Sequence, residues 1–74
     1  MSQPIDTATD YEGRPIEVGD IVRTLGGEMT GTVREIASED GEEFVRVRPT
    51  HMAAGKGVWH SADRLLFTKQ GRKR

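Results

Sequence analysis

Residues 38–48 read SEDGEEFVRVR, and this stretch decides the fold. Its centre, Asp40-Gly41, is the strongest short signal for a tight β-hairpin when alternating apolar and polar residues flank it on both sides. Such residues precede it in 28–37 and follow it in 43–48. We therefore expect two long antiparallel strands joined by a turn at Asp40-Gly41.

The strand after the turn alternates cleanly. Its side chains point in turn to opposite faces of a sheet. Val45 and Val47 therefore share one face, and Phe44, Arg46 and Arg48 share the other. We expect the valine face to lie in the core and the other face to point outward.

Shorter strands are expected on both sides of this hairpin. Gly19-Asp20 and Gly26-Gly27 are turn signals that bound an early β-branched run, and Ser61 is a residue type able to cap a single helical turn. Gly31, inside the second strand, indicates a bulge or a sharp bend. The expected strands are 21–25, 28–37, 43–48, 58–60 and 65–68, with the helical turn over 61–64.

Five short strands with one helical turn before the last fit a small closed all-β barrel, which leaves few sheet edges. A further set of residues carries a resemblance to known proteins: Val18-Gly19-Asp20-Ile21-Val22-Arg23, Gly26-Gly27, Met29-Thr30-Gly31-Thr32-Val33, Trp59 and Leu65-Leu66. On these residues the chain resembles SH3-like barrels of the KOW type and, more closely, the small bacterial YodC-type family. The resemblance implies a five-stranded SH3-like barrel and transfers no function.

Length and composition allow one small domain. The 74 residues include no cysteine, so no disulfide can stabilise the thin core. We expect a disordered arm over 1–10, the barrel over 11–68 and a basic tail over 69–74. The first residues lack the pattern of a signal peptide, and no apolar stretch is long enough to cross a membrane, so a cytoplasmic location is expected.

Charge is distributed unevenly along the chain. Residues 1–43 carry eleven acidic and three basic side chains, whereas 44–74 carry one acidic and eight basic. Interleaving of the two halves in one barrel would neutralise most of this asymmetry. Four of the acidic residues, Glu39, Asp40, Glu42 and Glu43, cluster at the hairpin turn, where they would repel nucleic acid and could face a basic protein partner.

One cluster of residues could support a catalytic interpretation: His51, His60, Ser61 and Asp63. A nucleophile needs a base within hydrogen-bond reach and a group to orient that base. His60 and Ser61 are neighbours on a strand and point to opposite faces, and the two histidines match no metal-ligand spacing. We therefore expect no enzyme activity, no metal and no cofactor.

Two aromatic residues, Trp59 and Phe44, are candidates for ligand binding. Trp59, the only tryptophan, is expected to be the main core residue, with an exposed ligand platform as the alternative. Phe44 is expected to point outward beside Arg46 and Arg48. An exposed ring between guanidinium groups could stack single-stranded nucleic acid, because the ring holds a base while the guanidinium groups hold phosphates.

Two functions follow. The first is a non-enzymatic binding module for a protein partner or assembly, using residues 49–57 and one barrel face. The second is a nucleic-acid-binding barrel that uses its basic residues and tail, with aromatic stacking. The oligomeric state stays open. The candidate binding residues are Phe44, Arg46, Arg48, Lys56, Trp59, Arg64, Lys69, Arg72, Lys73 and Arg74.

Overall fold

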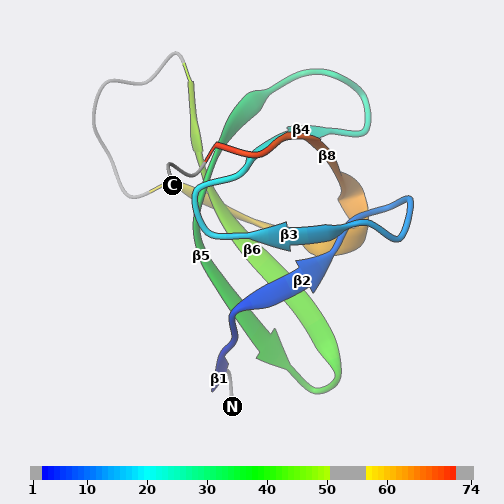
Figure 1. Ribbon diagram of the computed structural model, residues 1–74. Coiled ribbons are helices and arrows are strands. Elements are labelled where there is room, and N and C mark those ends of the chain that lie inside the picture. The colour runs from blue at the N-terminus through cyan, green and yellow to red at the C-terminus, as the bar shows by residue number, and fades with distance from the viewer. Residues whose placement is uncertain (1–2, 51–56, 72–74) are drawn as a thin grey trace.

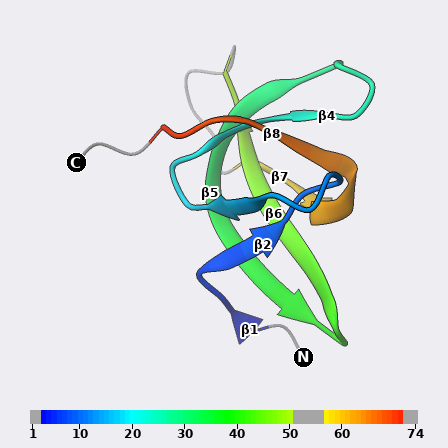
Figure 2. The same ribbon diagram turned by 45° about the vertical axis from the view of Figure 1, so that its right-hand side comes forward.

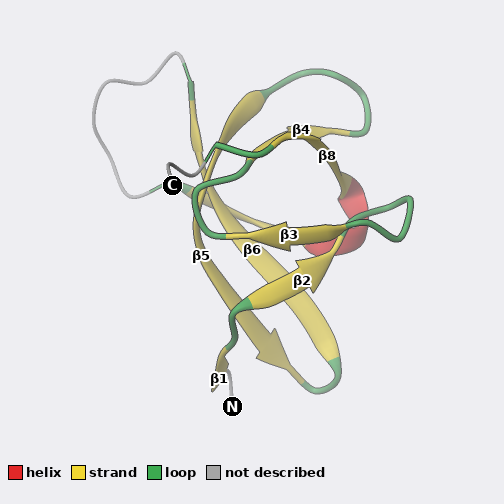
Figure 3. Ribbon diagram, viewed as in Figure 1, coloured by secondary structure: helices red, strands yellow, loops and turns green. Residues whose placement is uncertain are grey.

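The computed structural model describes residues 3–50 and 57–71. These residues form an all-β structure with one short 3-10 helix, η1, and no helix long and apolar enough to cross a membrane (Figures 1 and 3). The elements are β1 (Gln3–Pro4), β2 (Thr7–Thr9), β3 (Pro15–Glu17), β4 (Ile21–Thr24), β5 (Thr30–Glu39), β6 (Glu42–Pro49), β7 (Val58–Ser61), η1 (Ala62–Arg64) and β8 (Leu65–Lys69).

Two antiparallel sheets make up the structure. The larger sheet has the strand order β7-β6-β5-β4-β8, and β1 pairs with the far part of β5. The smaller sheet consists of β2 and β3, which cross over the long β5–β6 hairpin in both views (Figures 1 and 2). A main-chain hydrogen bond of 2.9 Å from Tyr11 N–H to the Leu65 carbonyl connects the segment between β2 and β3 to β8.

The β5–β6 hairpin confirms the prediction made from its turn. Asp40 has a φ of 54° and Gly41 a φ of 81°, and Glu39 pairs with Glu42 across the turn. Positive φ at both central residues is the signature of a type I′ turn, whose twist matches that of the strands. The expected alternation is also confirmed, since Val45 and Val47 are completely buried.

The core is aliphatic throughout the described residues. It joins side chains of both sheets and of η1, so the two sheets and the helical turn bury one common set. Val22, Val33, Val45 and Val47 supply β-branched side chains from three adjacent strands. The complete cluster is Ala8, Ile16, Val22, Val33, Ile36, Val45, Val47, Ala62 and Leu65.

The prediction that Trp59 is the main core residue is wrong. Its side chain is 46% exposed, and its strand partner is Arg46, which lies on the outward face of β6. The indole therefore follows the outward register of β7. The valines, isoleucines and leucine already fill the interior.

The expected disordered arm over residues 1–10 is also wrong where the structure describes it. Thr7–Thr9 pairs with Pro15–Glu17, Ala8 is 1% exposed within the core, and Asp10 is 4% exposed. β2 buries one small residue between two exposed threonines. A single alanine gives no readable hydrophobic period, so the pattern resembles a loop.

Gly31 is explained by close packing instead of a bulge. The register shift between β5 and β6 lies between Val33 and Glu35. A Cβ atom at Gly31 would collide with the Arg48 carbonyl oxygen and approach a Val47 methyl group to 2.7 Å. Glycine is therefore required because β6 crosses β5 closely here.

Two expectations at the C-terminal side need correction. Ser61 stands at the N-cap position of η1, but its side chain makes no capping hydrogen bond. β8 continues through Lys69, so the strand includes the first residue assigned to the basic tail.

Candidate functional site

The outward face of β6 carries three of the residues expected there. Phe44, Arg46 and Arg48 are all half-buried and alternate with the buried valines. Trp59 on β7 stands opposite Arg46, and Ala37 on β5 stands opposite Phe44. Two adjacent strands, β6 and β7, thus place two aromatic rings and two guanidinium groups on one surface, beside Ala37 of β5.

An open groove of about 340 Å³ lies on this surface. It is lined by Ala37, Glu39, Phe44 and Trp59, and we call it the aromatic groove. Ala37 is 9% exposed and forms its floor, because it is small and faces Phe44 across the strand pair. The groove therefore offers an apolar surface with one carboxylate in its lining.

Arg46 is held by Glu35. Its Nε donates to Glu35 Oε1 over 3.1 Å, and its Nη2 lies 3.1 Å from the same oxygen. Two contacts from a planar guanidinium fix its orientation and neutralise much of its charge. This pair joins an acidic residue of the first half of the chain to a basic residue of the second, as interleaving predicts.

The other basic candidates do not gather beside Arg46 and Arg48. Arg64 ends η1 and Lys69 ends β8, and both are exposed. β8 is separated from β6 by β4 and β5 in the sheet order. The structure therefore unites Phe44, Arg46, Arg48 and Trp59 on one face and places Lys69 at the other end of the strand order, whereas Arg64 lies outside the sheet, in η1. Lys56, Arg72, Lys73 and Arg74 lie outside the described residues.

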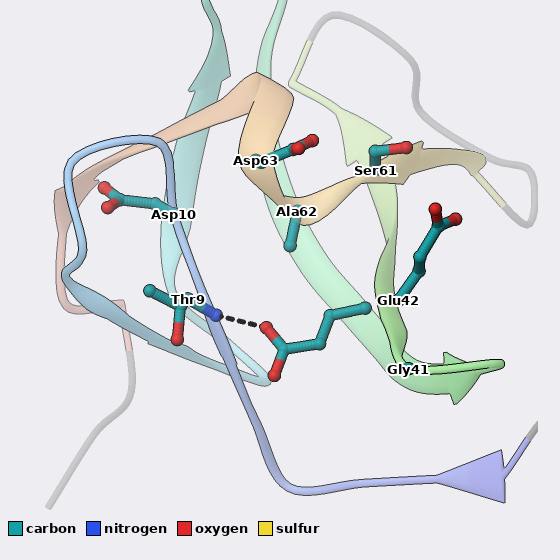
Figure 4. Close-up of a pocket in the computed structure, with 8 residues that line it drawn as sticks. Thr9, Asp10, Gly41, Glu42, Ser61, Ala62 and Asp63 are labelled. Carbon is teal, nitrogen blue, oxygen red and sulfur yellow. Dashed lines mark hydrogen bonds between the residues drawn. The ribbon is translucent and has the colours of Figure 1, made fainter.

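A second cavity, of about 360 Å³, lies at the end of β7 near the hairpin turn. We call it the acidic pocket. Figure 4 shows Asp63 and Ser61 on one side of it, Glu42 on another, and a hydrogen bond of 2.8 Å from the Thr9 N–H to the Glu43 carboxylate. The residues that line it are Thr9, Asp10, Gly41, Glu42, Glu43, Ser61, Ala62 and Asp63.

No family model, no curated protein and no solved structure matches the chain. The chemistry of the two cavities is therefore the basis for inferring a function. The aromatic groove suits apolar side chains, and the acidic pocket suits cationic ones. Both lie close to β7, the strand at one end of the larger sheet.

The candidate catalytic residues are not brought together. Ser61 and Asp63 line the acidic pocket, whereas His60 pairs with buried Val45 and does not line it. Burial lowers the pKa of His60, and its Nε2 is buried with no hydrogen-bond partner among the described residues. Within those residues, no group of three or more histidine, cysteine, aspartate or glutamate side chains could hold a metal ion. His51 lies outside the described part of the chain.

Two groove residues were missed by sequence reasoning. Ala37 and Glu39 are two positions apart on β5 and therefore share a face. Pairing the strands outward from the Asp40-Gly41 turn would have placed Ala37 opposite Phe44. The register shift near Arg34 lies beyond Ala37 and does not change this pairing. The position of the turn is therefore sufficient to predict it.

Proposed function

We propose that this chain is a non-enzymatic protein-binding module whose contact surface is the aromatic groove. The observation that carries the proposal is Trp59, which is 46% exposed beside half-buried Phe44 in the lining of the groove. Large aromatic side chains dominate the binding energy of protein interfaces, especially where they meet a pocket. Exposing the only tryptophan of a small chain suits binding better than stability.

The proposed framework is an SH3-like barrel. Its support is the curved hairpin of β5 and β6, the strand order of the larger sheet and the position of η1 directly before β8. The bond from Tyr11 N–H to the Leu65 carbonyl and the packing of β2 near β6 bring the smaller sheet over the same core. A rigid barrel of this kind would hold the groove in place before a partner arrives.

The charges around the groove favour a protein over a nucleic acid. Glu39 lines the groove, and Glu35 occupies the guanidinium of Arg46. Asp40 and Glu42 extend the negative charge at the adjoining turn. A phosphate backbone on this face would meet these carboxylates, whereas a basic or neutral peptide would not.

One observation favours the second candidate, a nucleic-acid-binding barrel. Phe44, Arg46 and Arg48 lie on the same face of β6, the arrangement expected of a stacking site. It is the weaker candidate because Arg46 is engaged by Glu35 and because Lys69 lies at the other end of the strand order from β6 and β7.

Selection of random peptides on the immobilised full chain tests the first proposal. We expect selected peptides to lose about 30-fold in affinity for Trp59→Ala, about 2 kcal/mol, because truncation of a central aromatic residue has an effect of that size. Tyr11→Ala is the matched control, since Tyr11 is an exposed aromatic residue at 63% that does not line the groove. Calorimetry measures both variants.

Equal binding of selected peptides to the wild type and Trp59→Ala would contradict the groove as the contact surface. A titration with single-stranded oligonucleotides, followed by Trp59 fluorescence at low and high salt, tests the second candidate. Salt-dependent binding that is lost in Arg48→Gln would favour nucleic acid over protein.

A further inference from the structure

The aromatic groove combines aromatic rings with a carboxylate. Trp59 is 46% exposed on β7 and lines the groove together with Phe44 and Glu39. Phe44 stands opposite Ser61, so Trp59 is its diagonal neighbour on the same face of the β6–β7 pair. Diagonal neighbours on antiparallel strands lie within reach of each other's aromatic side chains. A single ligand side chain can therefore contact both rings and the carboxylate.

Ring and carboxylate together already hold an arginine elsewhere in this chain. The Cζ of Arg14 lies 5.8 Å from the centre of the Phe67 ring, and its Nε lies 3.2 Å from Oδ2 of Asp10. The ring face attracts the guanidinium cation, and the carboxylate accepts its N–H groups. The contacts of Arg14 thus show how the groups that line the groove can bind a guanidinium.

Arg46, the residue opposite Trp59, is directed toward β5. Its Nε and Nη2 each lie 3.1 Å from Oε1 of Glu35, and β5 and β7 flank β6 on opposite sides. Arg46 is not among the described residues that line the groove. The ring of Trp59 is therefore accessible to a guanidinium from another molecule.

The charge around the groove complements a cation. Glu39 lines the groove, and exposed Asp40 and Glu42 extend the negative charge at the adjoining turn. Arginine suits this surface better than lysine, because its planar head stacks on aromatic rings, presents a fork of N–H groups to a carboxylate and is more weakly hydrated. Its methylene groups can cover apolar surface, which the floor at Ala37 provides.

We infer that the aromatic groove binds an arginine side chain from an exposed segment of a partner protein. The guanidinium plane stacks on Trp59, and its N–H groups donate to the Glu39 carboxylate. The methylene groups of the arginine lie against Phe44 and Ala37. This inference rests on the proposed function and names the partner side chain that the groove recognises.

A set of short peptides that differ only in their central residue tests the inference. Each is acetylated and amidated, with glycine and serine on both sides of an arginine, a lysine or a citrulline. Trp59 is the only tryptophan, so its indole N–H resonance in the full chain reports binding. We expect a saturable shift with arginine, at least about tenfold weaker binding of citrulline, which keeps the shape without the charge, and about threefold weaker binding of lysine.

Variants of single acidic residues test the role of Glu39. Glu39→Gln should reduce the preference for arginine over citrulline to less than about threefold, because the amide keeps the shape and removes the charge. Asp63→Asn is the matched control, since Asp63 is exposed and lines the acidic pocket instead of the groove, and it should keep the preference. A purely structural effect of Glu39→Gln would weaken both peptides and leave their ratio unchanged, which contradicts the assigned role.

The remaining outcomes separate the inference from the proposed function. Equal binding of arginine to citrulline, or of arginine to lysine, would overturn the inference. Failure of the arginine peptide to shift the resonance, while display-selected peptides bind through Trp59, would overturn the inference alone. Selected peptides that are insensitive to Trp59→Ala would overturn the proposed function as well. Self-association of the free chain that Trp59→Ala abolishes, seen by sedimentation, would assign the groove to a second copy and overturn the inference.

Discussion

Asp10 is the residue that ties the N-terminal segment to the rest of the molecule. Its side chain is fully buried and accepts main-chain N–H bonds from Glu12, Arg14 and Phe67 at 2.9, 2.7 and 2.8 Å. Arg14 adds an ion pair of 3.2 Å from its Nε. Burial raises the pKa of Asp10, but these hydrogen bonds and the Arg14 charge outweigh it and leave the pKa below the ordinary 3.8.

We expect Asp10→Asn to lower the free energy of unfolding by about 3 kcal/mol, because an amide oxygen replaces a carboxylate that accepts three main-chain bonds and one of its acceptors becomes a donor. Urea denaturation measures the change. Asp6→Asn is the matched control, since Asp6 is exposed in the same segment, and it should change the free energy by less than about 0.5 kcal/mol. Equal effects of the two would show that Asp10 does not anchor the segment.

Only part of the role of Asp10 is encoded locally. The bonds from Glu12 and Arg14 come from residues two and four positions away, and the Gly13 N–H donates to the Asp10 carbonyl at 3.1 Å, so Asp10 opens a turn of the kind that aspartate and glycine favour. The bond from the Phe67 N–H comes from 57 positions away and leaves no local pattern in the sequence.

The β5–β6 hairpin is the element that organises the site. Its turn sets the register that places Phe44 opposite Ala37 and Arg46 opposite Glu35 and Trp59. A shift of one residue would exchange the two faces, burying Phe44 and exposing Val45. The aromatic groove thus depends on the geometry of Asp40 and Gly41.

Gly31→Ala tests the close crossing of β5 and β6. The added methyl group would collide with the Arg48 carbonyl oxygen, which belongs to the main chain of a central strand and cannot move cheaply. We expect a loss of about 2 kcal/mol in the free energy of unfolding, as for other overpacked sites.

Gly41→Ala is the comparison for this prediction. An added methyl group there meets nothing within 4 Å, although the φ of 81° disfavours a side chain. We expect a loss of about 1 kcal/mol from that strain alone. A Gly31→Ala protein as stable as Gly41→Ala would argue against the tight crossing.

At the scale of the whole molecule, stability should depend on pH through His60. Burial lowers its pKa below the ordinary 6.5. As the pH falls through about 6.5, the unfolded chain binds a proton that the folded chain does not, so stability decreases until the pH reaches the folded pKa. Above about pH 7 both states are neutral and the effect vanishes.

We expect His60→Gln to flatten the dependence of the free energy of unfolding between about pH 7 and pH 5, measured by urea denaturation at several pH values. His51→Gln, which removes the other imidazole, serves as the control. Burial raises the pKa of Asp20 above 3.8, partly offset by a hydrogen bond from the Gly71 N–H, so stability from Asp20 is lost as the pH rises. The Asp20 contribution to the pH dependence has the opposite sign to that of His60. It is the same in the wild type and in His60→Gln, so it cancels when the two are compared. An unchanged slope in His60→Gln would contradict the assignment.

The sequence by itself determined the all-β class, the turn at Asp40-Gly41 and the inward face of Val45 and Val47. These features are local: a two-residue turn needs residues that tolerate positive φ, and a strand with one buried face must alternate. Phe44, Arg46 and Arg48 could be assigned to the outward face for the same reason. The residues beside them on neighbouring strands could be predicted only within the β5–β6 hairpin, where the turn sets the register. The neighbours on β7 could not be predicted in this way.

Only the tertiary structure decided where Trp59 lies, which distant residue Asp10 binds and how the basic residues are distributed. Trp59 is exposed because aliphatic side chains from both sheets occupy the interior. Whether an interior has room for an indole depends on the summed volume of all the side chains in it. Ala8 is buried because β3 and β6 lie beside it, so its strand is fixed by contacts distant in sequence. Arg46 on β6 is separated from Lys69 on β8 by the order of strands in the sheet, which no local pattern encodes.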